Sequence, residues 1–327
     1  MNENFINEIL TILATAIATS TPLIFACIGE TISEQSGVIN LSAEGTIMMG
    51  AMTGFAIAKF TDNLLLGFLG AAIVGAIIAL IVTFGAITLK QSQVAIGFVL
   101  ALLGTDLSSF LGNPIVRVPG PTVPNFKIPI LQDIPIFGKL LFQSDLLVYL
   151  SYLLIIFTWF YFYHTKPGLT LRAAGNQPAA AFARGTNVIL LRYFYTLLGG
   201  ALMGIAGAAF SLDFKAGWSY RHTAGYGWIA LAIVIFGGWH PLKVAFGVYL
   251  FGILQSLASV AQSAIPNVPT QVFTVAPFAL MIMVLVITSS DFLVNNKLPL
   301  PTKIRRWINQ TIRITPPAAL GKTFEQD

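Results

Sequence analysis

The chain has 327 residues, of which 56% are hydrophobic and only 9% are charged, and its formal net charge is +5 at pH 7. Ordinary globular proteins carry roughly 25% charged residues, so this composition excludes a soluble globular domain, a disordered chain and a disulfide-rich secreted scaffold. The positive charge does not indicate a nucleic-acid partner, because the 18 Lys and Arg residues are scattered around hydrophobic runs.

The hydrophobic runs predict an all-α polytopic membrane protein with about 8–10 transmembrane helices, surrounded by lipid. In chain order the uncharged runs are 9–29, 45–58, 64–89, 91–105, 146–163, 193–212, 224–239, 244–265 and 271–290. The runs at 45–58 and 224–239 are short and rich in glycine. Such runs are typical of broken or tilted helices beside a cavity, so we expect at least one broken helix.

The distribution of Lys and Arg predicts how the chain is oriented in the membrane. The segment 164–192 and the tail from residue 297 onward are rich in these residues. Because positive residues concentrate on the cytoplasmic side, we place both segments in the cytoplasm. With nine spans, the N-terminus would then lie outside. We expect a multi-pass protein of the bacterial plasma membrane.

These assignments divide the chain into a transmembrane domain and a tail. The transmembrane domain covers 1–296 and contains a proline-rich extracytoplasmic loop at 113–145 and a cytoplasmic loop at 165–191. The tail, 297–327, is basic, and its residues 302–314 have the pattern of an amphipathic helix that lies on the membrane surface.

Polar residues gather at 29–45, between the first two hydrophobic runs. Asn40 is placed to cap a helix that begins near Leu41, and Glu44 would then lie in its first turn, beside the positive end of the helix dipole. Two interpretations stay open, namely an interfacial cap with a solvated Glu44 or a polar site that faces a permeation pathway. Asp106, within an otherwise apolar run, is either functional or marks a helix end. The candidate pathway residues are Asn40, Ser42, Glu44, Phe55, Asp106 and Trp228.

The segment 168–185 predicts a short helix outside the bilayer. Pro178 suits the first helical position and Gly185 the position just past the end, with a glycine hinge before the helix. A helix of two turns is marginal alone. We therefore expect it to be held by other helices or by a partner, with a plain connector as the alternative.

Cysteine, histidine and phosphate-binding patterns give no sign of an enzyme. Cys27 is the only cysteine and the three histidines are far apart in sequence, so we expect neither a disulfide nor a metal site. Gly321-Lys322-Thr323 resembles the end of a phosphate-binding loop, but it lacks the upstream glycine and a following helix. We therefore expect no cofactor and no ATP site in this chain.

A resemblance to a known family is carried by three motifs. The first consists of Glu30, Ser33, Glu34, Gly37 to Leu41, Glu44 and Gly45, followed by Met48 to Ala51. The second lies in 171–185 and the third in 199–207. Together they resemble the permeases of ABC importers of the branched-chain amino acid, ribose and nucleoside class, most closely the simple-sugar or nucleoside branch.

This resemblance implies a type II ABC importer permease that works with a second permease, identical or paralogous, with cytoplasmic ATPases that bind ATP, and with an extracytoplasmic substrate-binding lipoprotein. It also implies that the second motif is the coupling loop whose short helix inserts into the ATPase. The residues that it assigns to ATPase coupling are Arg172, Gly175, Asn176, Pro178, Ala180, Ala181, Arg184 and Gly185.

The resulting hypothesis is the permease subunit of an ATP-driven importer for nucleosides or simple sugars. The alternative is an autonomous secondary transporter or channel that uses Glu44 and Asp106 as an ion or proton relay. In that case 164–185 would be a passive loop.

Overall fold

The computed structural model describes residues 3–289, apart from 127, 130, 131, 133, 135 and 266, together with 316–325. The predicted amphipathic helix at 302–314 lies outside the described residues. Within them the regular elements are helices: α1 (Glu3–Gln35), α2 (Ala43–Thr61), α3 (Leu64–Thr83), α4 (Gln93–Leu111), α5 (Phe137–Leu141), α6 (Leu146–His164), α7 (Lys166–Asn176), α8 (Pro178–Ala183), α9 (Val188–Ala209), α10 (Tyr226–Phe236), α11 (Pro241–Ala264) and α12 (Thr270–Ser289). Single π-helical turns, Phe84–Thr88 and Phe210–Phe214, extend α3 and α9, and Asn113–Ile115 forms a 3-10 turn.

The helices confirm an all-α polytopic membrane protein. Each of the nine predicted runs falls largely on one helix, and among the described residues six helical segments are long and apolar enough to cross a membrane: Ile9–Gln35, Leu64–Thr88, Gln93–Leu111, Leu146–His164, Val188–Phe214 and Pro241–Ala264. α10 has only 11 residues, about 16 Å of helix, which is too short for a bilayer core of about 30 Å. The prediction of a short helix at 224–239 is therefore confirmed.

The prediction of a short or broken helix at 45–58 is wrong, because α2 is continuous over 19 residues. The uncharged run looked short because Glu44 and Lys59 bound it, yet both residues are inside the helix. Charged residues can lie in the first or last turn of a transmembrane helix. An uncharged run is therefore shorter than the helix that contains it.

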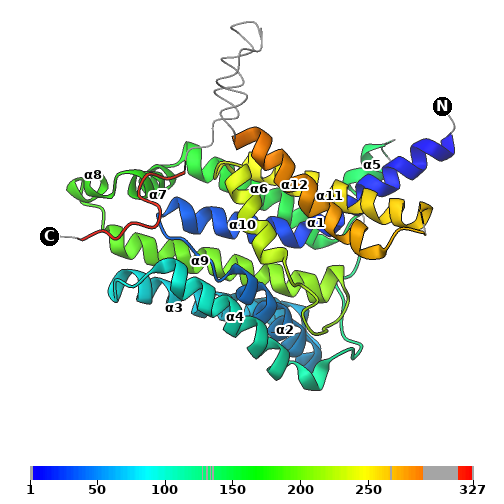
Figure 1. The fold of residues 1–327 in the computed structure, drawn as a ribbon, viewed down its shortest axis with the longest axis horizontal. Coiled ribbons are helices and arrows are strands. Elements are labelled where there is room, and N and C mark those ends of the chain that lie inside the picture. Colours follow the sequence, from blue (N-terminus) through cyan, green and yellow to red (C-terminus); the bar gives the residue numbers. More distant parts are fainter. Residues whose placement is uncertain are drawn as a thin grey trace, which may run out of the picture.

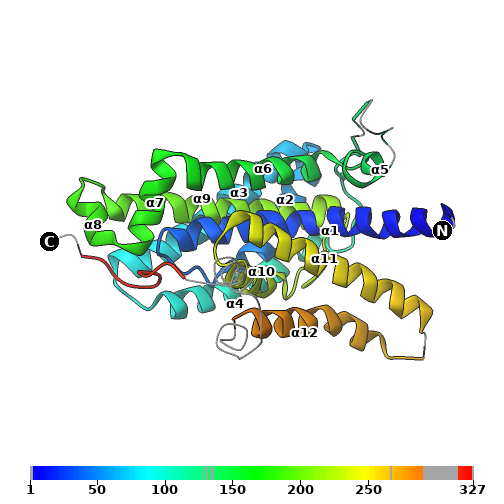
Figure 2. The ribbon, with the colours of Figure 1, turned by 90° about the horizontal axis from the view of Figure 1, so that it is seen from above.

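α1 and α9 run along the long axis of the molecule, whereas α2 and α4 are drawn at a slant to it (Figure 1). α7, α8 and the segment 316–325 lie together at one end of this axis, and the start of α1 lies with α5 at the other end (Figure 1). α10 is different, because Figure 2 shows it nearly end-on while α1 lies along the axis. The short helix thus crosses the bundle at a steep angle.

α9 is the central helix of the packing and contacts α1, α2 and α3. Small residues allow the close approach that van der Waals packing in lipid requires. A Cβ atom on Gly50 of α2 would stand 2.5 Å from the carbonyl oxygen of Gly204 in α9. Small residues at Gly50 and Gly204 thus let α2 and α9 approach closely.

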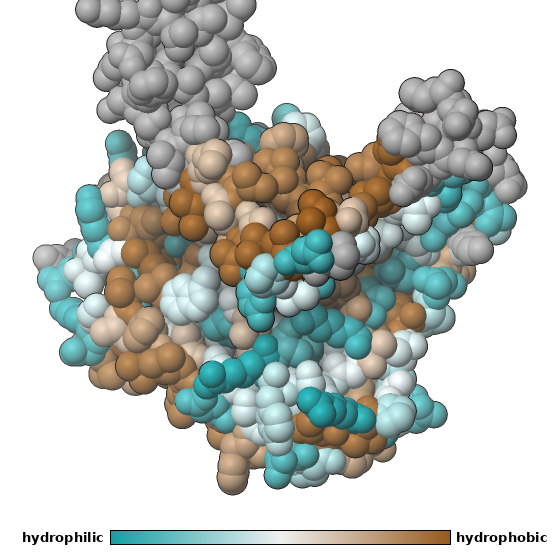
Figure 3. All heavy atoms as spheres, turned by 45° about the vertical axis from the view of Figure 1, so that its right-hand side comes forward, coloured by the Kyte–Doolittle hydropathy of each residue, from teal (hydrophilic) through white to brown (hydrophobic). Residues whose placement is uncertain are grey.

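The surface matches a protein surrounded by lipid. Large apolar side chains are exposed along α3, α4 and α6, including Leu65, Val99 and Phe157. On the face drawn in Figure 3, apolar residues cover broad areas while hydrophilic residues gather in a hollow between them. Many of these exposed apolar residues lie on helices that are long enough to span a bilayer.

Candidate functional site

The start of α2 and the start of α10 meet in the interior of the bundle. Glu44, in the first turn of α2, is only 8% exposed. Its Oε1 accepts a hydrogen bond from the N–H of Gly225 at 2.7 Å, and its Oε2 accepts one from the N–H of Gly227 at 2.9 Å. One carboxylate therefore satisfies two main-chain donors at the start of α10, where the helix dipole favours negative charge.

Glycine makes this junction possible. Gly225 has a φ of +92°, a conformation that side-chain-bearing residues rarely adopt. Gly227 lies against the backbone of Glu44, so that a Cβ atom there would overlap the Glu44 nitrogen. The glycines that bound the predicted run at 224–239 thus supply both the turn and the close approach.

Asn40 and Ser42 shape the chain just before α2. The helix begins at Ala43 with Ser42 as its N-cap residue, so the prediction that Asn40 caps a helix from Leu41 is wrong by two residues. Instead, the Oδ1 of Asn40, which is fully buried, accepts hydrogen bonds from the Ser42 N–H at 3.2 Å and from the Ser42 hydroxyl at 2.6 Å. Asn40 therefore stabilises the turn that places Glu44 beside the start of α10.

The other candidate pathway residues do not all gather here. Trp228, in the first turn of α10, is 40% exposed and its ring centre lies 6.2 Å from that of Phe98 in α4. Phe55 is fully buried in the packing between helices, so it has a packing role in this conformation. Asp106 is exposed and pairs with Arg221, with 3.3 Å between Oδ1 and Nη2. The structure thus brings Asn40, Ser42, Glu44 and Trp228 to one junction, and places Phe55 and Asp106 elsewhere.

Two buried carboxylates were not among the predicted site residues. Glu30 and Glu34 lie one turn apart in α1, which continues to Gln35 well past the hydrophobic run at 9–29. Glu34 accepts a hydrogen bond from the indole N–H of Trp239, and among the described residues neither carboxylate oxygen of Glu30 has a partner. Their spacing of four residues is the sequence signal for a shared helix face.

The connection from the π-helical turn Phe210–Phe214 to α10 carries titratable groups outside the spanning helices. Burial lowers the pKa of His222 to about 4, although its Nδ1 lies 2.8 Å from the carbonyl oxygen of Ser219. Burial also lowers the pKa of Lys215, whose ammonium donates to the carbonyl of His222. The connection that carries the start of α10 is therefore itself packed against the protein.

The short helix predicted within 168–185 is present as α8. Pro178 occupies its first turn, and Gly185 follows it with a φ of +84°. The predicted glycine hinge is wrong, because Gly175 lies inside α7 and the break between the helices is at Gln177. Gly175 is needed for packing instead, since a Cβ atom there would overlap the carbonyl oxygen of Gln35.

The predicted coupling residues divide into an exposed and a packed set. The exposed residues are Asn176, Ala180, Arg184 and Gly185, and Pro178 is half-buried. Gly175 and Ala181 are buried, while Arg172 lies with its guanidinium 4.5 Å from the ring centre of Tyr163. One face of α8 thus points away from the protein, and the other packs against it.

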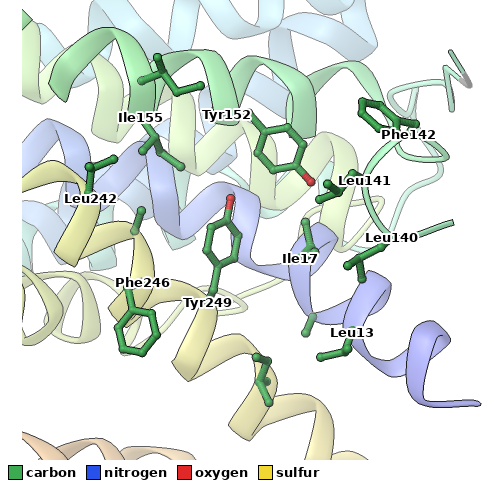
Figure 4. Close-up of a pocket in the computed structure, with 14 residues that line it drawn as sticks. Leu13, Ile17, Leu140, Leu141, Phe142, Tyr152, Ile155, Leu242, Phe246 and Tyr249 are labelled. Carbon is green, nitrogen blue, oxygen red and sulfur yellow. The ribbon is translucent and has the colours of Figure 1, made fainter. Parts of the chain in front are cut away.

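A large apolar pocket of about 670 Å³ lies between α1, α5, α6 and α11, away from these residues. Figure 4 shows its lining, in which Tyr152 of α6 and Tyr249 of α11 stand among apolar side chains. None of the candidate pathway residues lines this pocket. Among the described residues there is also no group of three His, Cys, Asp or Glu side chains that could hold a metal ion.

Sequence comparisons point to one family. The profile of the family described as the permease component of branched-chain amino acid transport systems matches residues 12–285. A candidate glucose ABC transporter permease of Haloferax volcanii, TsgC13, is 37% identical over 79% of this chain and 81% of its own length. The guanosine ABC transporter permease NupQ of Bacillus subtilis is 32% identical over 85% and 92%. The nucleoside ABC transporter permease NupC of Lactococcus lactis is 31% identical over 86% and 93%.

No solved structure matches the chain. The family match covers most of the chain, including α1 to α11 almost entirely, and it agrees with the helical membrane fold. The chain therefore belongs to the family of ABC transporter permease components that includes those of branched-chain amino acid transport systems.

Proposed function

We propose that the chain is the permease subunit of an ATP-driven importer for nucleosides or simple sugars in the bacterial plasma membrane. Its proposed partners are cytoplasmic ATPase subunits, a second permease and an extracytoplasmic substrate-binding lipoprotein. ATP would be bound by the ATPase, and this chain would carry no cofactor. The named substrates of the relatives, glucose, nucleoside and guanosine, support this substrate class.

The observation that carries the ATP-driven mechanism is α8. A helix of six residues cannot be stable by itself, yet here it lies at one end of the bundle with most of its residues exposed. Only Ala181 is buried, against Ala174 and Val188. Such an exposed helix is suited to a groove on a partner, which is a common mode of helix recognition.

The proposed pathway is centred on the α2–α10 junction. Asn40, Ser42, Glu44 and Trp228 would line the route of the substrate when α10 moves relative to α2. Polar side chains at helix ends in the interior of a membrane protein are where transporters bind polar substrates. Glu44 would hold the junction closed, because its carboxylate ties the start of α10 to α2.

Uptake into proteoliposomes tests this proposal. The chain is reconstituted with its ATPase and binding protein, and Ala180→Cys on α8 is used for crosslinking, with Cys27 replaced by Ala. We expect uptake of labelled guanosine or glucose only with ATP, and a crosslink from residue 180 to the ATPase. Uptake by the isolated chain driven by an ion gradient alone would instead establish a secondary transporter.

A further inference from the structure

The segment 316–325 packs on the same end of the molecule as α7 and α8. In Figure 1 it is drawn in red beside α7 and runs toward α8. Pro317 and Ala319 are buried, whereas Ala318 and Lys322 are exposed. The segment includes the Gly-Lys-Thr sequence, which has no role in ATP binding in the proposed function.

The segment 316–325 makes its first contacts with the end of α7, which holds some of the predicted coupling residues. The N–H of Ala319 donates to the carbonyl oxygen of Gly175 at 2.9 Å, and the N–H of Ala318 donates to Oδ1 of Asn176 at 3.3 Å. Further along, the ring of Phe324 lies edge-on to that of Phe182 in α8, with 6.1 Å between the ring centres. The segment therefore contacts both α7 and α8.

Its second set of contacts is with the connection between α1 and α2. The N–H of Gly321 donates to the carbonyl oxygen of Gly37 at 3.0 Å. Gly321 has a φ of +73°, and a Cβ atom there would stand 2.7 Å from Cδ1 of Ile39. The positive φ favours glycine at this position, while the Ile39 side chain could move to accommodate a Cβ atom. The connection that it contacts leads through Asn40 to Glu44.

Arg192 joins these contacts from α9. Its side chain is only 2% exposed, its Nη1 donates to the carbonyl oxygen of Lys322 at 2.9 Å, and its Nε donates to the carbonyl oxygen of Ser36 at 3.2 Å. A buried guanidinium that bonds two carbonyl groups holds them in a fixed relation, because leaving either bond unmade is costly. Arg192 thereby links the segment to the start of the α1–α2 connection.

We infer that residues 316–325 are a strap that positions α8 and transmits its displacement to the α2–α10 junction. This inference rests on the proposed function. The strap contacts α8, which has an exposed face, at one point and the connection that leads to Glu44 at another. A push on α8 would therefore move the α1–α2 connection through the strap, as well as through the contact of Gly175 with Gln35.

Two variants of the reconstituted complex test the strap. One ends after residue 315, and the other is Gly321→Pro, which removes the N–H that bonds Gly37 and cannot adopt a φ of +73°. Lys322→Ala is the matched control, because only the main-chain carbonyl of Lys322 bonds Arg192. ATP hydrolysis, substrate uptake and co-purification of the ATPase are measured for each variant.

We expect both variants to retain the ATPase and its hydrolysis while uptake per ATP hydrolysed falls about tenfold, the size of a typical coupling energy. The control should behave like the unmodified chain. Unchanged uptake per ATP in both variants would overturn the strap, and so would an equal loss of hydrolysis and uptake, which would indicate a purely structural role. Neither result would affect the proposed function, which fails only if the unmodified complex transports without ATP.

Discussion

Glu44 and Arg184 are both charged, yet they stand in opposite surroundings. Glu44 is buried, both of its carboxylate oxygens bond main-chain N–H groups, and its backbone lies against Gly227. Arg184 is exposed at the end of α8, and the neighbouring Gly185 has nothing within 4 Å of where a Cβ would stand. This difference fits the two proposed roles. The α2–α10 junction can open only if its own contacts break, whereas α8 has an exposed surface that a partner can bind.

Overpacking the junction should have the largest effect. Gly227→Val places side-chain atoms where the backbone of Glu44 lies, and we expect the free energy of unfolding to fall by about 3 kcal/mol, at the upper end for overpacked sites. Thermal unfolding in detergent measures this change. Ala180→Val, on the exposed face of α8, is the matched control and should leave the melting temperature unchanged. Equal melting temperatures for both variants would contradict the close contact at Gly227.

Neutralising the carboxylate tests the electrostatic part of the junction. In Glu44→Gln one oxygen still accepts a hydrogen bond, but the amide NH₂ faces a second N–H donor, which costs about 1–3 kcal/mol. We expect uptake to fall several-fold while the ATPase still co-purifies. Asp106→Asn is the control, because Asp106 is exposed and its ion pair is worth little. Normal uptake by Glu44→Gln would leave Glu44 as a cap without a role in transport.

Acid should weaken the connection that carries the start of α10. The pKa of His222 is about 4 in the folded protein and about 6.5 in an unfolded chain. Between these values the unfolded chain binds more protons, so stability is complete above pH 6.5 and declines as the pH falls toward 4. We expect a loss of about 1–2 kcal/mol, allowing for partial exposure of the ring. The melting temperature of His222→Gln should decline less over this range, and an identical decline would rule out His222 as the cause.

Changes on the exposed face of α8 should have the smallest effect on the isolated chain. Arg184→Ala should alter the free energy of unfolding by less than about 0.5 kcal/mol, as is usual for surface positions. The same variant should reduce co-purification of the ATPase, because Arg184 belongs to the face that is free for a partner. Unchanged co-purification would remove Arg184 from the proposed coupling surface. A large loss of stability would show that the face is not free.

The helices could largely be predicted from the sequence because every transmembrane helix needs a run of about 20 apolar residues. Long uncharged runs such as 64–89 and 146–163 correspond closely to α3 with its π turn and to α6. Pro178 and Gly185 mark the ends of α8 because proline and glycine each restrict or permit a specific backbone conformation.

The contacts between distant segments could not be predicted in the same way. Glu44 was singled out through its own helix, but its partners Gly225 and Gly227 are about 180 residues away in sequence, and main-chain N–H groups leave no side-chain signature. The contacts of the strap could not be predicted for the same reason, since Ala319 and Gly321 bind through their main-chain N–H groups. The position of Phe55 depends on the side chains around it, which hydrophobicity alone does not specify.

The transmission of motion from α8 to the α2–α10 junction is the central claim. Nitroxide labels at Phe98→Cys and Trp228→Cys, with Cys27 replaced by Ala, report the separation of α4 from the start of α10, whose native ring centres are 6.2 Å apart. Spin–spin broadening is measured in the reconstituted complex before and after ATP addition. We predict that the broadening changes with ATP and that this change is much smaller when the strap is removed, because the contact of Gly175 with Gln35 remains. Identical broadening with and without ATP in the intact complex during turnover would contradict the account.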